Sequence, residues 1–310
     1  MPTSGQSLAY IGLVLTPLFW AGNAVVARGT VGDIPPLSMS FWRWVLALAI
    51  LLPFGLPGIL RHRRVIRAHL GSIVALATFS VAAFNSLLYA AAMTTTATNI
   101  ALINATIPIF VALLAWILLG DRTRPTQVAG IGMAIVGILC VIARGDLSVL
   151  TGLQAQSGDL IMVGAVFCWG LFSVLLRRQA VPLPALTFLT IQILVGALVL
   201  LPVYLTDLLF FSGGFEVSQT TLLPLLFFAI FPGILAYAFW NHGVHSIGPS
   251  RTAIFMYLTP VYASVLAIIF LGESLSLFHL VGGSLILGGL ILATQSKRPF
   301  QRQLARTQQP

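Results

Sequence analysis

The sequence predicts an all-α polytopic membrane protein, with ten transmembrane helices arranged as two inverted five-helix repeats. Hydrophobic residues make up 58% of the 310 residues and charged residues only 7%, too few charges to cover a soluble protein of this size. Apolar runs near the ~20 residues that a helix needs to cross a bilayer recur along the chain. These runs are continuously apolar, unlike the alternating strands of a membrane β-barrel. An internal repeat predicts the inverted arrangement.

Length and the positions of polar, proline and glycine residues define the ten expected spans. The connections between them are short, which leaves no room for a separate soluble domain. The expected spans cover residues 8–28, 37–56, 69–91, 98–119, 126–143, 157–177, 184–206, 220–243, 250–271 and 276–294.

The repeat is clearest in the last two spans of each half. The segment that begins at Ile107, IPIFVALLAWILLGDRTRPTQVAGIGMAIVG, returns 152 positions later as TPVYASVLAIIFLGESLSLFHLVGGSLILGG. Each half holds an odd number of spans, so the two copies insert in opposite orientations around one shared site, as in alternating-access transporters. The matched residues are Pro108 with Pro260, Gly120 with Gly272, Gly130 with Gly282, Gly137 with Gly289, and Asp121 with Glu273.

The first helices of the two halves match at an offset of 149 positions. The aligned pairs are Trp20 with Trp169, Arg28 with Arg177, and Arg43 with Gln192. The expected organisation is a cytoplasmic N-terminus at 1–7, a first repeat at 8–143, a periplasmic connection at 144–156, a second repeat at 157–294 and a basic cytoplasmic tail at 295–310.

The basic residues set the expected orientation. With the N-terminus inside the cell, 13 of the 16 Lys and Arg residues fall in inside loops or the tail, and only Arg28 and Arg144 fall outside. This is a strong positive-inside signal, so we expect a multi-pass protein of the bacterial inner (plasma) membrane with both termini cytoplasmic. The net charge of +9 is then a topology signal and a contact with membrane lipids. Because the basic residues are scattered over separate loops, we expect no nucleic-acid partner.

The two cysteines, Cys140 and Cys168, lie inside expected spans and supply neither a disulfide framework nor a set of metal ligands. We therefore expect no cofactor and no metal. The first apolar run has no cationic segment before it and no small-residue cleavage site after it, so we expect a retained first helix and not a signal peptide.

Several motifs carry a resemblance to a known family. They are Trp20 near the end of the first helix, FWRW early in the second, ALINATIPIF in the fourth, the LG[DE] turns and the glycine-rich last helix of each half. On these motifs the chain resembles the drug/metabolite transporter superfamily with two EamA repeats, and most of all the bacterial aromatic amino-acid exporters of the YddG type. The resemblance implies ten helices, a central cavity lined mainly by helices one to four and six to nine, and peripheral fifth and tenth helices.

Polar side chains inside the apolar spans are the first candidates for a substrate site. A buried amide costs a few kcal/mol unless it is hydrogen-bonded, so these side chains should face one another or a water-filled cavity. Asn85 and Tyr89 share one helix face, and so do Tyr237 and Asn241. They either line the cavity or form hydrogen bonds that hold helices together. The candidate amides are Asn23, Asn85, Asn99, Asn104, Gln192 and Asn241.

Aromatic residues form a second group of candidates. Trp42 and Trp44 lie near the outer end of the second span and are interpreted as anchors at the membrane interface. Deeper aromatic residues either form a wall for a flat or apolar substrate group or pack as ordinary core residues. These deeper residues are Trp20, Tyr89, Trp169, Tyr237 and Tyr257.

Prolines and ionisable residues inside the spans complete the candidates. Pro108 and Pro260 lie mid-span at matching positions, and we interpret them either as paired hinges or as fixed kinks. Arg43 either extends outward to the interface, forms a structural bond to backbone carbonyl groups, or attracts a substrate carboxylate. His242 is a possible proton switch, although its place near a helix end favours an ordinary solvated histidine.

The seven acidic residues all lie in loops or at helix ends, at Asp33, Asp121, Asp146, Asp159, Asp207, Glu216 and Glu273. Exporters that exchange cations for protons use a carboxylate within the membrane, so the sequence favours neutral or zwitterionic substrates. We expect a monomeric uniporter that exports amino acids, aromatic ones first, with other neutral amino acids and toxic metabolites as further substrates. The alternatives are a proton-coupled multidrug or other small-metabolite exporter and, more remotely, a membrane scaffold or intramembrane enzyme. Because the chain carries no HExxH or GxSxG motif, we expect no enzymatic activity.

Overall fold

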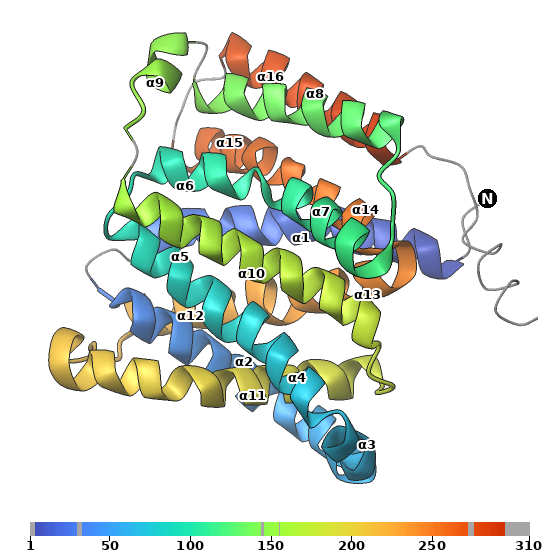
Figure 1. The fold of residues 1–310 in the computed structure, drawn as a ribbon. Helices are drawn as coiled ribbons and strands as arrows, with labels where there is room; N and C mark the ends of the chain where they lie inside the picture. The colour runs from blue at the N-terminus through green and yellow to red at the C-terminus, as the bar shows by residue number, and fades with distance from the viewer. Residues whose placement is uncertain (1–3, 30–32, 144–145, 155, 272–275, 295–310) are drawn as a thin grey trace, which may run out of the picture.

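The computed structural model describes residues 4–29, 33–143, 146–154, 156–271 and 276–294. Over these ranges the chain is helical and no strand occurs. Most of the helices are long and run back and forth across the molecule (Figure 1). In chain order the elements are α1 (Ser4–Gly29), α2 (Pro36–Arg61), α3 (Arg63–Ala68), α4 (Leu70–Ala77), η1 (Thr78–Ala83), α5 (Phe84–Ala92), α6 (Ala97–Asn104), α7 (Ile107–Leu119), α8 (Pro125–Ile142), α9 (Leu147–Thr151), α10 (Ser157–Gln179), α11 (Ala185–Asp207), η2 (Leu208–Ser212), α12 (Gln219–Phe228), η3 (Ala229–Leu235), α13 (Ala236–Ile247), α14 (Pro249–Ile254), η4 (Phe255–Tyr257), α15 (Leu258–Leu271) and α16 (Leu277–Thr294).

These elements confirm the expected all-α fold with ten membrane spans. Within the described ranges, nine helical segments are long and apolar enough to cross a membrane, and α1 contains a shorter apolar stretch at Ser7–Asn23. The span ends agree with the expected ones to within a few residues, because proline begins several helices as the sequence suggests. Several expectations fall outside the described residues: those on 1–3, Arg144, Gly272, Glu273 and the tail 295–310, and those on the side chains of Arg28 and Tyr89.

Irregular turns occur at equivalent positions of the two halves. The π-helical turns η1 and η3 interrupt the third span of each half. The fourth span is interrupted between α6 and α7, and its counterpart passes through the 3₁₀ turn η4. Pro108 and Pro260 each follow this interruption, as expected for residues that lack an N–H and crowd the preceding turn. Their action as hinges stays a prediction.

The last helices of the two halves, α8 and α16, cross at their matched glycines. A methyl group at Gly130 would lie 2.6 Å from the carbonyl oxygen of Gly289, and one at Gly137 would lie 2.6 Å from that of Gly282. The two backbones therefore touch where only glycine leaves room, as in other closely packed membrane helices. This pair lies at one edge of the bundle (Figure 1).

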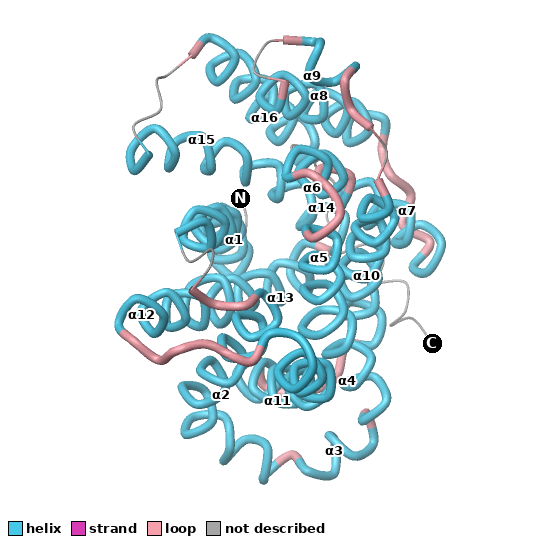
Figure 2. Tube along the Cα trace, turned by 90° about the vertical axis from the view of Figure 1, so that its left-hand side faces the viewer, coloured by secondary structure: helices cyan, strands magenta, loops and turns pink. Residues whose placement is uncertain are grey.

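The largest helix contacts follow the inverted repeat. α10 packs on α5 and α7 as α1 packs on α13 and α15, and α2 packs on α11. α14 also packs on α7, at the end of the bundle that holds the Gly120 turn. Over the described residues, the equivalent pair α6 and α15 makes no comparable contact, and in Figure 2 the left-hand end of α15 lies apart from α6. Among the described residues, the α14–α7 contact at the Gly120 end therefore has no equivalent at the opposite end.

Candidate substrate site

A chain of hydrogen bonds crosses the buried interior and joins the two repeats. Arg43 Nη2 on α2 donates to Asn85 Oδ1 on α5 at 2.5 Å. Gln192 Nε2 on α11 donates to Ser80 Oγ on η1 at 2.9 Å, and Asn241 Nδ2 on α13 donates to Gln192 Oε1 at 3.0 Å. We call this the polar network, and its members are Arg43, Ser80, Asn85, Gln192, Tyr237 and Asn241.

The π-helical turn η1 gives Ser80 its place in the polar network. A π turn disturbs the regular backbone hydrogen bonds and leaves carbonyl groups open to side chains. The Ser80 carbonyl oxygen accepts hydrogen bonds from Tyr237 Oη at 2.7 Å and from Asn85 Nδ2 at 3.3 Å. Asn85 Nδ2 also lies 3.2 Å from the Val81 carbonyl oxygen, and the Ser80 hydroxyl donates to the Leu76 carbonyl oxygen at 2.7 Å. Asn85 is therefore held in one orientation.

Aromatic rings gather around Trp169 beside this network. The ring centroid of Trp169 lies 5.3 Å from Trp20, 5.2 Å from Trp240 and 5.6 Å from Tyr237. Edge-to-face and tilted contacts at such distances are favourable for aromatic pairs. Tyr237 belongs to both groups, because its hydroxyl reaches Ser80 and its ring packs on Trp169. We call the group the aromatic cluster, and its members are Trp20, Phe84, Trp169, Phe172, Tyr237 and Trp240.

Several of the candidate residues have a buried polar atom with no hydrogen-bond partner in the part of the chain that the structure describes. Buried polar atoms are nearly always paired in folded proteins, since leaving one unpaired costs free energy. A polar molecule bound here would supply the missing partners. The atoms are Arg43 Nε, Asn104 Oδ1, Trp169 Nε1, Asn241 Oδ1 and Tyr257 Oη.

Other candidate residues lie away from the polar network. Asn99 Nδ2 donates to both carboxylate oxygens of Asp159 at 3.0 Å and to the Gln154 carbonyl oxygen at 3.2 Å, so it fastens α6 to the start of α10. Asn23 is half-buried on α1, and no hydrogen bond links it to the polar network over the described residues. His242 is half-buried near the end of α13, where its Nε2 lies 3.5 Å from Ser246 Oγ.

Two expectations about α2 are wrong. Arg43 does not extend outward to the interface, because its side chain is only 4% exposed and bonds to Asn85. Trp44 is 0% exposed and packs its ring 5.0 Å from that of Tyr237, so it is a core residue and not an interfacial anchor. Trp42 and Trp44 are two residues apart, about 200° around a helix, and therefore face opposite sides. Trp42 is half-exposed and donates to Tyr204 Oη at 3.1 Å.

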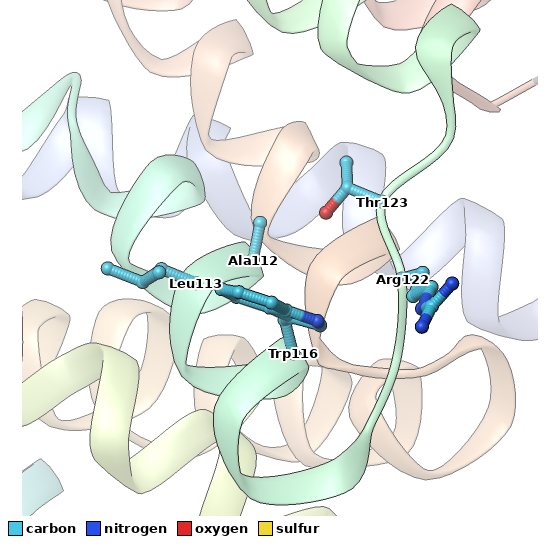
Figure 3. Close-up of a pocket in the computed structure, with 5 residues that line it drawn as sticks. All are labelled: Ala112, Leu113, Trp116, Arg122 and Thr123. Carbon is cyan, nitrogen blue, oxygen red and sulfur yellow. The ribbon is translucent and has the colours of Figure 1, made fainter.

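A separate pocket of about 400 Å³ lies at the Gly120 end of α7, on the outside of the bundle (Figure 3). Its lining residues come from α7 and the turn that follows it: Ala112, Leu113, Trp116, Arg122 and Thr123. Leu113 and Trp116 are about half exposed, as expected for side chains that face lipid. None of the polar network or the aromatic cluster lines this pocket.

Comparison with known proteins assigns the family. The EamA-like transporter family matches residues 7–143 and, as a second copy, 156–295. This chain belongs to the EamA-like transporter family. An uncharacterized transporter of Bacillus subtilis, YyaM, is 31% identical over 92% of this chain and 93% of its own length. A probable amino-acid metabolite efflux pump of Salmonella typhimurium is 27% identical, and the match covers 90% of this chain and 92% of the pump. A probable terminal-alkyne amino-acid exporter of Streptantibioticus cattleyicolor is 24% identical, and the match covers 92% of this chain and 93% of the exporter.

A solved crystal structure shares the fold of this EamA protein. It superposes with a TM-score of 0.77 at 22% identity, and covers 98% of this chain and 99% of the other. The expected family and its two repeats are thereby confirmed, and the protein is a multi-pass membrane transporter.

Sequence reasoning missed several residues of the EamA bundle's interior. Ser80 joins the polar network through the π turn η1. The sequence of η1, TFSVAA, gives no sign of such a turn. Trp240 donates to Ser173 Oγ at 3.3 Å and packs on Trp169, although it was not singled out. The available signal for Trp240 was its position beside Asn241 on a helix that also carries Tyr237, since both of these residues were already candidates for the site.

Proposed function

We propose that this protein exports amino acids, with aromatic ones as main substrates and other neutral amino acids and toxic metabolites as further ones. The observation that carries the proposal is the contact between the aromatic cluster and the polar network through Tyr237. Such a site offers flat apolar surface to a side chain and hydrogen-bonding groups to the charged ends of an amino acid. Two relatives named for amino-acid export support the same substrate class.

The proposed mechanism is alternating access. α14 packs on α7 at one end of the bundle, whereas the equivalent pair α6 and α15 makes no comparable contact over the described residues. In an inverted repeat the two halves can exchange these arrangements, which opens the closed end and closes the other around the same site. We propose that Pro108 and Pro260 serve as the hinges of this exchange and that the Gly120 end faces the cytoplasm.

We propose uniport as the mode of transport. The six acids that the structure describes lie in connections or at helix ends, and no hydrogen bond joins any of them to the polar network. They are Asp33, Asp121, Asp146, Asp159, Asp207 and Glu216. Export of cations against protons needs a carboxylate or a similar group that binds both. Proton coupling through His242 remains the alternative, and counterflow at equal pH on both sides of the membrane tests it. A strict requirement for a pH gradient would exclude uniport.

The test of the function is substrate counterflow in proteoliposomes with a panel of amino acids and cationic toxins. We expect uptake of neutral amino acids, with aromatic ones fastest. Trp20→Ala and Trp169→Ala should each lower aromatic uptake by about tenfold, because each removes a large ring contact worth about 1–2 kcal/mol. Trp116→Ala is the matched control, since this tryptophan is exposed on α7 outside the aromatic cluster. Unchanged uptake in both cluster variants would contradict the proposed site.

A further inference from the structure

We infer that Arg43 binds the carboxylate of the transported molecule and thereby makes a carboxylate a requirement for transport. This inference rests on the proposed function and adds the group that selects the substrate. It concerns an arginine that belongs to the polar network and that Trp44 connects to Tyr237 of the aromatic cluster.

The first observation is that Arg43 is a buried cation with little of its hydrogen-bonding capacity in use. Its side chain is 4% exposed, and over the described residues its one hydrogen bond goes from Nη2 to Asn85 Oδ1. A guanidinium carries five N–H donors in a planar fork. Nε is buried and has no partner among the described residues, so at least this donor is unsatisfied without a ligand. A carboxylate matches one edge of the fork with two parallel hydrogen bonds.

The second observation is that no carboxylate of the described protein balances this charge. Among the residues that the structure covers, no acid forms an ion pair with Arg43. Its neighbours there are the Asn85 amide oxygen, 2.5 Å from Nη2, and the face of Trp44, whose ring centroid lies 4.7 Å from the guanidinium carbon. A buried charge is costly unless it is paired, and a substrate carboxylate supplies the pair. Gln192, which matches Arg43 in the second repeat, is neutral, so the two repeats offer one cation and one amide.

The third observation is that the guanidinium is held in place. Asn85 is fixed by the carbonyl oxygens of Ser80 and Val81, which turns its Oδ1 toward Arg43. Asn85 is therefore a positioning residue. Trp44, which follows Arg43, packs on Tyr237, and Tyr237 packs on Trp169. The side chain of a molecule whose carboxylate binds Arg43 would therefore lie near these aromatic rings.

The experiment compares tryptophan with tryptophanamide and tryptamine, which keep the ring and lose the carboxylate. We expect wild-type counterflow to favour tryptophan over either analogue by about tenfold or more, as sites built to pair a polar group reject ligands that lack it. Arg43→Gln should reduce this preference to about twofold or less, mainly through slower tryptophan transport. Arg43→Lys should give an intermediate preference, because the ammonium keeps the charge without the fork.

Arg61→Gln is the matched control, because it makes the same change at an exposed position at the end of the same helix. It should keep the wild-type preference. Thermal unfolding of the purified variants checks the fold independently, and tryptophan should stabilise the wild type more than tryptamine does. A structural role for Arg43 would lower transport of all three compounds alike.

The outcomes separate this inference from the proposed function. If the wild type transports no amino acid, the proposed function fails. If it transports tryptophan and tryptophanamide equally, or if Arg43→Gln keeps the preference, only the carboxylate inference fails. A further outcome is that tryptamine transport depends on chloride in the wild type but not in Arg43→Gln. Chloride would then be the counter-ion of Arg43, and the inference would be overturned as well.

Discussion

Tyr237 is the residue on which the two parts of the candidate site meet. Its hydroxyl donates to the Ser80 carbonyl oxygen at 2.7 Å, and its ring contacts those of Trp44 and Trp169. A side chain with an apolar ring and a polar hydroxyl is suited to this position. The ring packs against other aromatic rings, while the hydroxyl keeps its hydrogen bond to the polar network.

Removing only the hydroxyl of Tyr237 separates these two roles. We expect Tyr237→Phe to lower the free energy of unfolding by about 1 kcal/mol, since the Ser80 carbonyl loses one hydrogen bond while ring packing is kept. Tyr237→Ala should cost about 3–5 kcal/mol, because the ring contacts are lost too. Thermal unfolding in detergent measures both. Equal stability of wild type and Tyr237→Phe would contradict the role given to the hydroxyl.

At the residue scale, helical spacing predicted part of the site. Tyr237 and Asn241 are four apart and both join the polar network, as their shared helix face predicts. The same reasoning could not place Asn99, because its partner Asp159 lies on a different helix. It also misplaced Trp44, since nearness to a span end says nothing about which side of the helix faces lipid.

At the element scale, the crossing of α8 and α16 depends on glycine. A methyl group at Gly137 would meet the Gly282 carbonyl oxygen, a backbone atom that cannot move aside without separating the helices. At Gly132, on the same helix, a methyl group would meet nothing within 4 Å among the described residues. The two positions therefore form a matched pair for substitution.

We expect Gly137→Ala to destabilise the protein by about 1–3 kcal/mol through overpacking of the helix crossing. Gly132→Ala should be neutral or stabilise it by up to about 1 kcal/mol, because alanine has the higher helix propensity. Unfolding of the two variants in the same detergent gives the comparison. If both substitutions had the same effect, helix propensity and not close backbone packing would explain the glycines.

Span positions were predictable because apolar runs ending at proline, glycine or polar residues leave little choice of boundary. The π turn η1 was not, since its residues include neither proline nor glycine. In η3 the available signal was Pro232, which lacks the N–H of a regular helical turn. The interruptions before Pro108 and Pro260 fall between these cases, because proline marks the place and tertiary packing decides the conformation.

At the scale of the whole molecule, the inverted repeat predicts that equivalent turns lie on opposite sides of the membrane. In a background where Cys140 and Cys168 are alanine, we expect Arg122→Cys to react with an impermeant maleimide only from the cytoplasmic side. Ser274→Cys, in the equivalent turn of the second repeat, should react only from the outside. Labelling of both from one side would contradict the inverted arrangement and the transport mechanism with it.

The crossed glycines also bear on the ancestry of the chain. Gly130 meets Gly289 and Gly137 meets Gly282, while the sequence matches Gly130 with Gly282 and Gly137 with Gly289. A single five-helix protein that paired with itself about a two-fold axis would form both contacts from one pair of glycines. Once the two copies are encoded separately along one chain they are free to diverge, and the arginine of one copy at the position of the glutamine in the other is an asymmetry that two identical chains cannot have.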